Sequence, residues 1–532
     1  MKKKFLSVFI ASFLAFGFYA QQFNEISNIN PATYPFYSLN NFCEINNKLV
    51  LTNSVYSSAN RIYISDGTLN GTFSIYSWSS FTHLIVPNEI NSCGDVEELK
   101  SFVKLNNQLY FKLRNVQTGL EFLWKTSGDS IGTSLVKDLG TRKFCSNLIE
   151  LNGSLFFMTT DYDPVWGNTT KELWKTDGTQ NGTVVINNWV NSSNFSNDVK
   201  IVKYYNKIYF SGFESDGSSI GTIQTGLVLP PEKESCMYNG FIYYKGIDGK
   251  IWKSDGTLNG TSQAVDFPVT GNLYVFNGYI YFSGGFSGAG QSGSELCKTD
   301  GTLANTIILK DIYVGFNSSN PGNFISLNNY LFFIASDGLW KTDGTSVGTL
   351  MVKDGLGNCS TNYSTHQSIH NNELYFSINT YPSNQNGVWK TDGSELNTIL
   401  VQPSDTVGLI LDINCKLFAV LDTMRQYNSG GGVMVDNSEL WCLIDSCSSV
   451  SLTQKEDFNS FSIYPNPTSN SITIKGETNM NQNFKIFDQM GREVFKGKLT
   501  GTETEVNFSS LSKGMYTLKI EGNYQPAQIV KE

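Results

Sequence analysis

One short stretch recurs through most of the chain and constrains its fold more than any other feature. It reads Leu-Trp-Lys-Thr-Asp-Gly-Thr at residues 339–345 and is followed by Gly-Thr at 348–349, with close copies at 173–179 and 251–257. Aligned on the Asp, the copies stand at Asp66, Ser127, Asp177, Asp216, Asp255, Asp300, Asp343 and Asp392, and a truncated ninth copy has Ile444 there. Spacings of 39 to 61 residues indicate propeller blades or arrays of helix pairs.

An aromatic position decides between these two architectures. Three residues before the Asp position stand Tyr63, Trp124, Trp174, Phe213, Trp252, Cys297, Trp340, Trp389 and Trp441, so six of the nine tryptophans share one place in the repeat. An aromatic residue followed by Asp-Gly-Thr predicts a strand and a turn, because Asp hydrogen-bonds the backbone two residues on and Gly adopts positive φ. Leu173 and Trp174 point to opposite faces of their strand, which indicates burial between two neighbouring sheets.

A second hairpin precedes each copy. Asn-Gly or Asn-Asn separates apolar runs at Asn106-Asn107, Asn152-Gly153, Asn239-Gly240, Asn277-Gly278, Asn328-Asn329 and Asn371-Asn372, with weaker versions at Asn46-Asn47, Asn206 and Asn414. Such pairs favour type I′ turns, which need positive φ twice. Two hairpins per unit make four antiparallel strands, and the sequence therefore predicts an all-β propeller of eight or nine blades.

The N-terminal segment predicts export and ring closure. Residues 1–20 combine three lysines with a short apolar run, which is typical of a secretory signal peptide, with cleavage expected between Ala20 and Gln21. Residues 23–31 resemble the fourth strand of a unit, and the truncated ninth unit lacks that strand. We therefore expect residues 23–31 to complete the last blade and close the ring.

The C-terminal segment changes character. Residues 21–447 carry the repeats, 448–460 are a polar linker, and 461–532 show short alternating strands that predict a small β-sandwich. Within this last segment, Tyr464-Pro465-Asn466-Pro467, then Gly491, Gly514 and Lys531 stand at spaced positions. This set of motifs resembles the type A C-terminal sorting domain of the type IX secretion system.

The resemblance has definite implications. It implies a Bacteroidetes-type Gram-negative source, passage through the periplasm, contact of residues 461–532 with the type IX secretion machinery, and a final place outside the cell or on its surface. The upstream unit resembles the ELWKTDGT repeats of exported proteins that bear this domain, and that resemblance implies a propeller without implying an activity.

The repeated Asp residues favour a structural role. They resemble the Asp box of sialidases in sitting on a turn between strands, but that box separates its Asp and Gly by one residue, whereas here they are adjacent. A residue present in nearly every blade is expected to stabilise a turn, because a ring has a single axial site. No catalytic residue is therefore assigned.

No metal or cofactor site is expected. His366 and His370 lie four residues apart on a strand, which separates them by roughly 13 Å, and His83 stands alone. Two groups of loop acids could serve as acid/base carboxylates or calcium ligands, namely Asp161 with Asp163, and Asp95 with Glu97 and Glu98. The favoured interpretation is that both groups are simply exposed to solvent. Export permits disulfides among the nine cysteines, Cys442 and Cys447 being the closest pair, and Cys297 is expected to be a buried thiol.

Composition narrows the function. The net charge is −9, and −12 once the three lysines of residues 1–20 are removed. The mature chain has no basic clusters, which argues against nucleic acid as a partner, and no second apolar run predicts a transmembrane segment. The leading hypothesis is a binding or adhesion module for glycan or protein on one propeller face. The alternatives are a polysaccharide-active hydrolase or lyase, and a structural surface component. Equivalent loop tips in several blades would favour binding, and one blade-specific polar cluster would favour catalysis.

Overall fold

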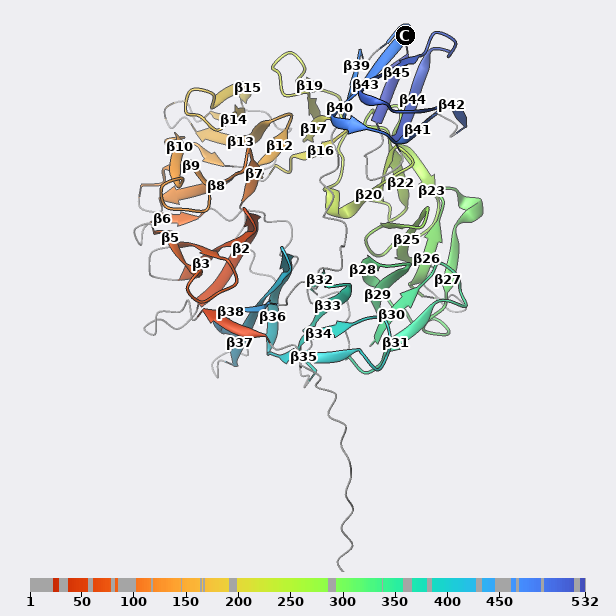
Figure 1. Ribbon diagram of the computed structural model, residues 1–532. Coiled ribbons are helices and arrows are strands. Elements are labelled where there is room, and N and C mark those ends of the chain that lie inside the picture. The colour runs from red at the N-terminus through yellow and green to blue at the C-terminus, as the bar shows by residue number, and fades with distance from the viewer. Residues whose placement is uncertain are drawn as a thin grey trace, which may run out of the picture. The chain divides into compact units, whose positions relative to one another are not determined.

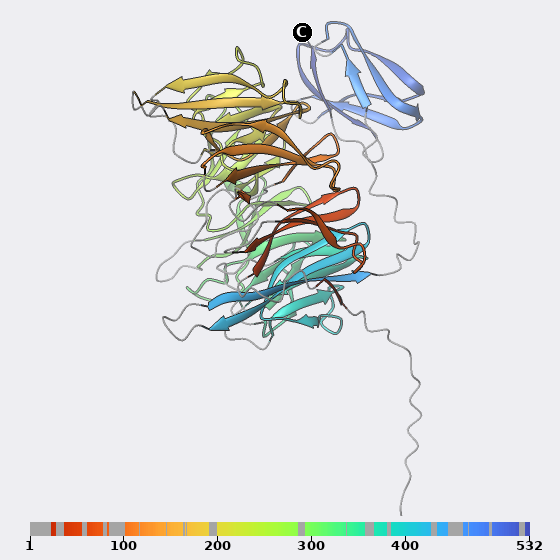
Figure 2. The same cartoon turned by 90° about the vertical axis from the view of Figure 1, so that its left-hand side faces the viewer.

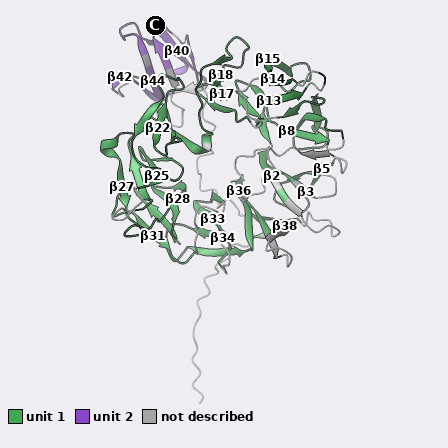
Figure 3. Ribbon diagram, turned by 180° about the vertical axis from the view of Figure 1, so that it is seen from behind, with its two compact units in different colours: residues 1–446 green, residues 447–532 purple. Residues whose placement is uncertain are grey.

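Apart from two short 3₁₀ turns, the regular elements in the described part of the protein are all β-strands. The computed structural model describes residues 23–27, 37–55, 61–77, 82–84, 102–115, 118–144, 146–162, 165, 168–190, 199–285, 293–336, 338–356, 366–379, 385–426, 433–444, 461–465, 468–488, 492–520 and 527–531. Within these ranges the helical elements are two 3₁₀ turns, η2 (Glu232–Glu234) and η3 (Leu303–Asn305). The chain divides into two compact units, Met1–Ser446 and Cys447–Glu532 (Figure 3).

The described part of the first unit forms nine antiparallel sheets, here numbered in chain order. Sheet 1 contains β2 (Tyr37–Ile45), β3 (Lys48–Val55), β4 (Arg61–Ser65) and β5 (Phe73–Ser77). Sheet 2 contains β6 (Thr82–Leu84), β7 (Val103–Leu105), β8 (Gln108–Asn115), β9 (Glu121–Thr126) and β10 (Ser134–Asp138). Sheet 3 contains β11 (Lys143–Phe144), β12 (Ile149–Leu151), β13 (Ser154–Tyr162), β14 (Thr169–Thr176) and β15 (Val184–Val190).

The middle sheets are four-stranded meanders. Sheet 4 contains β16 (Val202–Tyr204), β17 (Lys207–Phe210), β18 (Phe213–Ser215) and β19 (Ile223–Gln224). Sheet 5 contains β20 (Ser235–Tyr238), β21 (Phe241–Lys245), β22 (Ile251–Ser254) and β23 (Ser262–Val265). Sheet 6 contains β24 (Tyr274–Phe276), β25 (Tyr279–Gly284), β26 (Glu295–Thr299) and β27 (Ile307–Lys310).

The last sheets repeat the same order. Sheet 7 contains β28 (Gly322–Leu327), β29 (Tyr330–Ala335), β30 (Gly338–Thr342) and β31 (Leu350–Lys353). Sheet 8 contains β32 (Gln367–His370), β33 (Glu373–Ile378), β34 (Gly387–Thr391) and β35 (Ile399–Pro403). Sheet 9 contains β36 (Thr406–Ile413), β37 (Lys416–Gln426), β38 (Val433–Ile444) and, from the other end of the chain, β1 (Asn24–Ser27).

The strand β1 is the outer strand of sheet 9. It pairs with β38 in antiparallel register, with Asn24 opposite Cys442 and Glu25 opposite Trp441. Phe23, which is 1% exposed, packs edge-on against Tyr375 of sheet 8 at 6.5 Å between ring centroids. The expected completion of the last repeat by the N-terminal strand is thus confirmed for residues 24–27.

Nine apolar clusters join the sheets in a circle. Eight of the clusters combine buried side chains of two sheets that are consecutive in the chain. The ninth joins sheet 9 to sheet 1 through Phe418 and Leu51. Figures 1 and 2 show the sheets of this unit following one another around a closed ring. Because both faces of each sheet pack on a neighbour, Leu173 and Trp174 are both buried, as predicted.

Two sides of the ring follow from the meander. The turns between first and second strands lie at the same end of a sheet as those between third and fourth strands, and we call this side the turn face. The first-to-second-strand turns of neighbouring sheets touch there: Asn107 Nδ2 donates to Asn46 Oδ1 at 2.6 Å and the Tyr238 hydroxyl to the carbonyl of Gly278 at 2.7 Å. The connections from one sheet to the next lie on the opposite side, the crossover face.

The hairpin turns on the turn face have the predicted backbone. Both central residues have positive φ at Asn46-Asn47, Asn106-Asn107, Asn152-Gly153, Tyr205-Asn206, Asn239-Gly240, Asn277-Gly278, Asn371-Asn372 and Asn414-Cys415. This is the type I′ signature, which matches the twist of the flanking strands. At Asn328-Asn329 only Asn328 has positive φ, so the prediction of two positive φ angles is wrong there. The weaker copies at Asn46-Asn47, Asn206 and Asn414 form the same turn as the other strong ones.

The second unit holds two further sheets. One contains β39 (Phe461–Tyr464), β40 (Ser471–Met480) and β43 (Gly501–Asn507), and the other β41 (Asn483–Phe487), β42 (Glu493–Lys498), β44 (Gly514–Ile520) and β45 (Ala527–Lys531). They share one buried cluster, which includes Ile472 and Val506 of the first sheet and Phe484 and Leu518 of the second.

Candidate functional site

The Asp of the repeat organises its own turn. In sheet 7, the amide and hydroxyl of Thr345 both donate to Asp343 Oδ1, at 2.8 and 2.7 Å. The Thr345 hydroxyl in turn accepts from the amide of Gly348 at 2.9 Å. The same two bonds to the carboxylate occur at Asp66, Asp177, Asp216, Asp255, Asp300 and Asp392. All these carboxylates are used by local backbone and hydroxyl groups.

A buried pair of hydroxyls closes each turn from below. Thr342 and Thr349 share a hydrogen bond of 2.8 Å, and Thr342 also accepts from the amide of Gly344. Equivalent pairs are Ser65–Thr72, Thr126–Thr133, Thr176–Thr183, Ser215–Thr222, Ser254–Thr261, Thr299–Thr306 and Thr391–Thr398. Sequence reasoning missed this pair, although its spacing of seven residues recurs in all eight complete copies.

The degenerate copy in sheet 2 restores the turn with a different residue. Ser127 stands at the Asp position, but Asp129 accepts from the amide of Gly132 at 2.6 Å and from the Ser127 hydroxyl at 3.0 Å. The carboxylate has moved two residues along the chain. Asp129 is thus a turn residue that alignment on the Asp position does not reveal.

The turn carboxylates form a circle of fixed negative charge. The hydrogen bond from the Thr345 hydroxyl lowers the pKa of Asp343, and equivalent hydroxyl bonds lower the pKa of Asp66, Asp177, Asp216 and Asp300. Asp177, Asp216 and Asp343 are exposed and Asp66 and Asp300 are half-buried, and all five are ionised at neutral pH. The turn face therefore presents one negative charge at each of these turns.

Each turn is also held by the preceding sheet. A Cβ added to Gly344 would lie 2.7 Å from the Tyr281 hydroxyl, and Lys298 donates to the Gly344 carbonyl at 2.8 Å. An aromatic ring of the previous sheet faces the same glycine at Tyr110–Gly178, Phe156–Gly217, Tyr209–Gly256, Tyr243–Gly301, Phe332–Gly393 and Phe418–Gly67. The glycine is required both for its positive φ and for this close contact.

The repeated tryptophans do not converge on one site. Their indole N–H groups bond within their own sheets: Trp174 with Thr159, Trp252 with Asp248, Trp389 with the Gln385 carbonyl and Trp441 with Glu439. Trp124 and Trp340 are half-buried in the clusters between sheets. They serve the packing of the ring.

Four carboxyl groups have a raised pKa. The pKa of the exposed Glu25 in β1 is raised by partial burial and by the charge of Glu439, and the other three groups lie in different sheets. Burial raises the pKa of Glu121, of Glu295 and, to about 6, of Asp422. Glu121 accepts from the amide of Phe144, and Asp422 accepts from the Ser438 hydroxyl. Each of these three groups is occupied by protein hydrogen-bond donors, and no two of them share a site.

Glu295 fixes the segment 311–321, which joins sheet 6 to sheet 7 on the crossover face. It is 0% exposed and accepts from the amides of Ile312 and Tyr313, at 2.8 and 3.3 Å. It also accepts from the amide and the hydroxyl of Ser319, at 2.9 and 2.6 Å. A buried carboxylate with four donors holds both ends of the segment in place.

The middle of that segment presents apolar side chains to solvent. Tyr313 is 48% exposed, Phe316 71% and Val314 84%. Gly315 between them has φ of +110°. Large aromatic rings on a fixed base are the usual anchors of binding sites. The sequence signal for this loop was the run Tyr313-Val314-Gly315-Phe316, which falls outside the repeat.

Two of the histidines and five of the cysteines have a described environment. His370 is buried and bonds Asp412 at 2.5 Å, and burial lowers the pKa of His366 to about 4. Among the described residues no group of three His, Cys, Asp or Glu side chains is placed to hold a metal ion. Cys297 is a buried free thiol, as predicted. Cys442 is also a buried free thiol, so it does not pair with Cys447, its nearest cysteine in the sequence, and Cys415 is disulfide-bonded.

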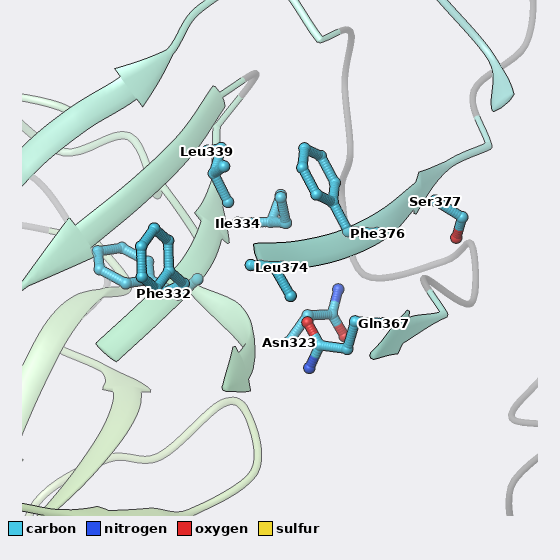
Figure 4. A pocket seen from close by; sticks show the side chains of 9 residues that line it. Asn323, Phe332, Ile334, Leu339, Gln367, Leu374, Phe376 and Ser377 are labelled. Carbon is cyan, nitrogen blue, oxygen red and sulfur yellow. The ribbon is translucent and has the colours of Figure 1, made fainter. Parts of the chain in front are cut away.

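A small pocket lies between sheets 7 and 8. It is lined mostly by apolar side chains, among them Phe332, Leu339 and Phe376, with Asn323 and Gln367 at one side (Figure 4). Its volume of about 10 Å³ is about what one water molecule needs. This pocket is too small for an organic ligand.

Several predicted residues have a defined place in the second unit. Tyr464 ends β39 and is joined to Pro465 by a cis peptide bond. Gly514 begins β44 and pairs in register with Lys531 of β45, whose ammonium donates to the carbonyl of Ser469.

Other predictions fall outside the described residues. They concern the cleavage site at Ala20 and Gln21, the linker 448–460, the acids Asp95, Glu97, Glu98 and Asp163, and the motif residues Asn466, Pro467 and Gly491. Asp161 is described and lies 3.6 Å from Arg142. In the part that the structure describes, no helix has the length and apolar character needed to span a membrane.

Solved structures similar to this chain have low sequence identity to it. PorZ, an essential bacterial surface component of the type IX secretion system of Porphyromonas gingivalis, is 12% identical over 92% of this chain and 75% of its own, with a TM-score of 0.29. The extracellular domain of the one-component system BT4673 from B. thetaiotaomicron is 10% identical over 92% and 85%, with a TM-score of 0.31. The β-propeller domain of the Trilobed protease from Pyrococcus furiosus is 13% identical over 60% and 99%, with a TM-score of 0.25.

Sequence comparison gives one further match. No curated protein matches the chain. Residues 462–531 match the secretion system C-terminal sorting domain. This segment is the sorting tail of a type IX secretion substrate, and it implies export to the cell surface or secretion.

Proposed function

We propose that this protein is a nine-bladed β-propeller, exported by type IX secretion from a Bacteroidetes-type bacterium, that binds saccharide at the crossover face. In this proposal residues 1–20 are a signal peptide cleaved between Ala20 and Gln21, 21–447 form the propeller, 448–460 are the linker, and 461–532 form a sorting β-sandwich. The circle of nine apolar clusters and the pairing of β1 with β38 support the propeller. The cluster shared by two sheets supports the sandwich.

The state of the buried acids favours binding over catalysis. A hydrolase or lyase needs paired carboxyl groups that reach a substrate. Here Glu121, Glu295 and Asp422 lie in sheets 2, 6 and 9, and each is bonded to protein donors. Their raised pKa values follow from burial and not from an open catalytic cleft.

The fixed loop 311–321 is the observation that carries the proposal. Tyr313 and Phe316 offer flat apolar faces of the kind on which the C–H faces of a sugar ring stack. Exposed Asn317, Ser318 and Asn320 stand next to them and supply amide and hydroxyl groups for sugar hydroxyls. Because Glu295 already orders the loop, binding loses little conformational freedom.

The test is a glycan and polysaccharide array with the chain from Gln21 onward. The double variant Tyr313→Ala/Phe316→Ala is expected to weaken any hit by roughly 10-fold or more, since buried aromatic anchors dominate such interfaces. Tyr162→Ala is the matched control, because Tyr162 is 61% exposed and lies in sheet 3. Thermal melting checks that all variants fold equally well.

Three results contradict the proposal. An array without saccharide hits removes the ligand class and leaves a protein ligand as the alternative. A double variant that binds as tightly as the wild type removes the loop as the site. Release of shortened or unsaturated products from a bound polysaccharide makes the protein an enzyme.

A further inference from the structure

A second surface stands out on the turn face. At seven of the eight Asp-Gly-Thr-type turns, a large aliphatic side chain three or four residues after the Asp position points into solvent, between 56% and 95% exposed. We call them the aliphatic tips: Leu69, Ile131, Ile220, Leu258, Leu303, Val347 and Leu396. Single exposed apolar residues are common on any surface, but seven of them at two adjacent positions of a repeat form a regular pattern.

The turn chemistry places the tips at one level. Each tip lies between the residue that bonds the Asp carboxylate and the Thr of the buried hydroxyl pair, as Val347 lies between Thr345 and Thr349. The buried hydroxyl pair recurs in all eight turns, including that of sheet 2, so the tips project from equivalent points around the ring. The turn of sheet 3 has Gln180 and Asn181 at the two positions, and both are exposed. The turn therefore tolerates polar residues there.

The spacing of the tips indicates a soft and planar partner. Each tip belongs to a different sheet, packed sheets lie about 10 Å apart, and charged turn residues stand between them. A rigid protein partner buries a contiguous patch around a central cluster of anchors, whereas each tip here stands on a different sheet. A lipid interface closes around each separate side chain without a preformed socket.

Charge limits the kind of lipid. The ionised carboxylates of Asp66, Asp216 and Asp343 lie within three or four residues of Leu69, Ile220 and Val347. Lysine ammonium groups lie close enough to lower the pKa of these carboxyl groups further, Lys416 at Asp66, Lys207 at Asp216 and Lys298 at Asp343, so the turns carry both signs of charge. A zwitterionic surface also carries both signs and no net charge, so it matches this face better than an anionic bilayer does.

We propose that the turn face docks on zwitterionic lipid bilayers, with the aliphatic tips entering the headgroup region. The inference is independent of the saccharide site, because that site lies on the crossover face. It adds a membrane-surface role to a chain in which no described helix could span a membrane.

The test measures binding to phosphatidylcholine vesicles by flotation, with the chain from Gln21 onward, since residues 1–20 would themselves bind lipid. The variants copy the polar turn of sheet 3. They are Leu69→Gln, Leu258→Gln, Leu303→Gln, Ile131→Asn, Ile220→Asn, Val347→Asn and Leu396→Asn. The seven-fold variant is expected to lose binding by about 10-fold or more. The reverse change, Gln180→Leu, is expected to strengthen it about two-fold.

Controls separate the tips from general surface apolarity. Val228→Asn/Ile247→Asn removes two exposed aliphatic residues, 68% and 113% exposed, that lie outside these turns and should bind as the wild type. Vesicles with half phosphatidylglycerol should bind no more tightly than phosphatidylcholine vesicles, because the lysines and the carboxylates of the turns offset each other. Absence of binding to phosphatidylcholine, or an unchanged seven-fold variant, overturns the proposal. So does tighter binding to the anionic vesicles, which would assign the contact to basic groups.

Discussion

The Tyr209 hydroxyl donates a 3.2 Å hydrogen bond to the carbonyl of Gly256, 47 residues further along the chain and in the next sheet. A Cβ on Gly256 would lie 2.8 Å from that hydroxyl and 2.6 Å from the ring of Tyr205. This contact recurs around the ring with other aromatic residues. It couples the conformation of each turn to the packing of the sheet before it.

Replacing Gly256 by Ala therefore tests the coupling. The φ of +87° strains any L side chain, and the clash adds to that strain, so we expect a loss of about 2–4 kcal/mol in the free energy of unfolding. Gly249→Ala is the control, since its φ is +74° and nothing lies within 4 Å of the added Cβ. It should cost about 1 kcal/mol. Equal losses in urea unfolding would show that the sheet contact contributes nothing.

The buried hydroxyl pair can be tested with an isosteric change. Thr342→Val removes the hydroxyl that accepts from the amide of Gly344 and that bonds the hydroxyl of Thr349. We expect a loss of about 1–3 kcal/mol in the free energy of unfolding. Thr345→Val at the exposed end of the same turn should cost less, because water replaces the lost bonds there. The reverse order would contradict the assigned roles.

The turn carboxylates predict a dependence on acid. The pKa of Asp343 is lowered in the folded state, chiefly by the Thr345 hydroxyl, so its contribution to stability is complete above the unfolded pKa of about 4 and is lost as pH falls through the folded value. Asp343→Asn should be less stable than the wild type at pH 7, should approach it as the pH falls below the folded pKa, and should therefore flatten this acid limb. Urea unfolding between pH 2.5 and pH 7 measures it, and an unchanged limb would exclude Asp343 as a source.

Asp422 has the opposite effect on the pH dependence of stability. Its pKa is raised to about 6 by burial, so the unfolded chain loses the proton first as pH rises, and the free energy of unfolding falls between about pH 4 and pH 6. Asp422→Asn should be more stable than the wild type at pH 7, by on the order of 1–2 kcal/mol, and equal to it near pH 4. The same stability difference at both pH values would refute the titration.

The closing strand can be probed at Phe23. This side chain is buried against Tyr375, and Phe23→Ala is expected to cost about 3–5 kcal/mol. Loss of sheet 9 should follow selectively, with faster hydrogen exchange in β36 to β38 than in sheets 4 and 5. Gln22→Ala, just before the strand, is the control for changes near the end of the chain. Uniform exchange across all sheets would argue against Phe23 as a local closure.

The local features of the repeat could be predicted from the sequence because their causes lie within about seven residues. The Asn turns need positive φ, Asp343 bonds the backbone two residues on, and both facts follow from residue type. The match of β1 to a missing fourth strand came from the same counting. The sorting domain could be read because several motifs agree at fixed spacings.

The remaining features were decided by the tertiary structure. Asp129 takes over the turn at Ser127, Glu295 reaches four donors in another segment, and Cys442 stays a buried thiol; each depends on which atoms meet in space. The partner of Gly256 lies 47 residues away and that of Asp66, Lys416, 350 residues away. The sequence by itself determined the strands, their turns and the sorting tail, because these depend on local hydrogen bonding and on motifs. Only the closed ring decided which surfaces remain exposed, because burial is a property of neighbouring sheets and not of any single repeat.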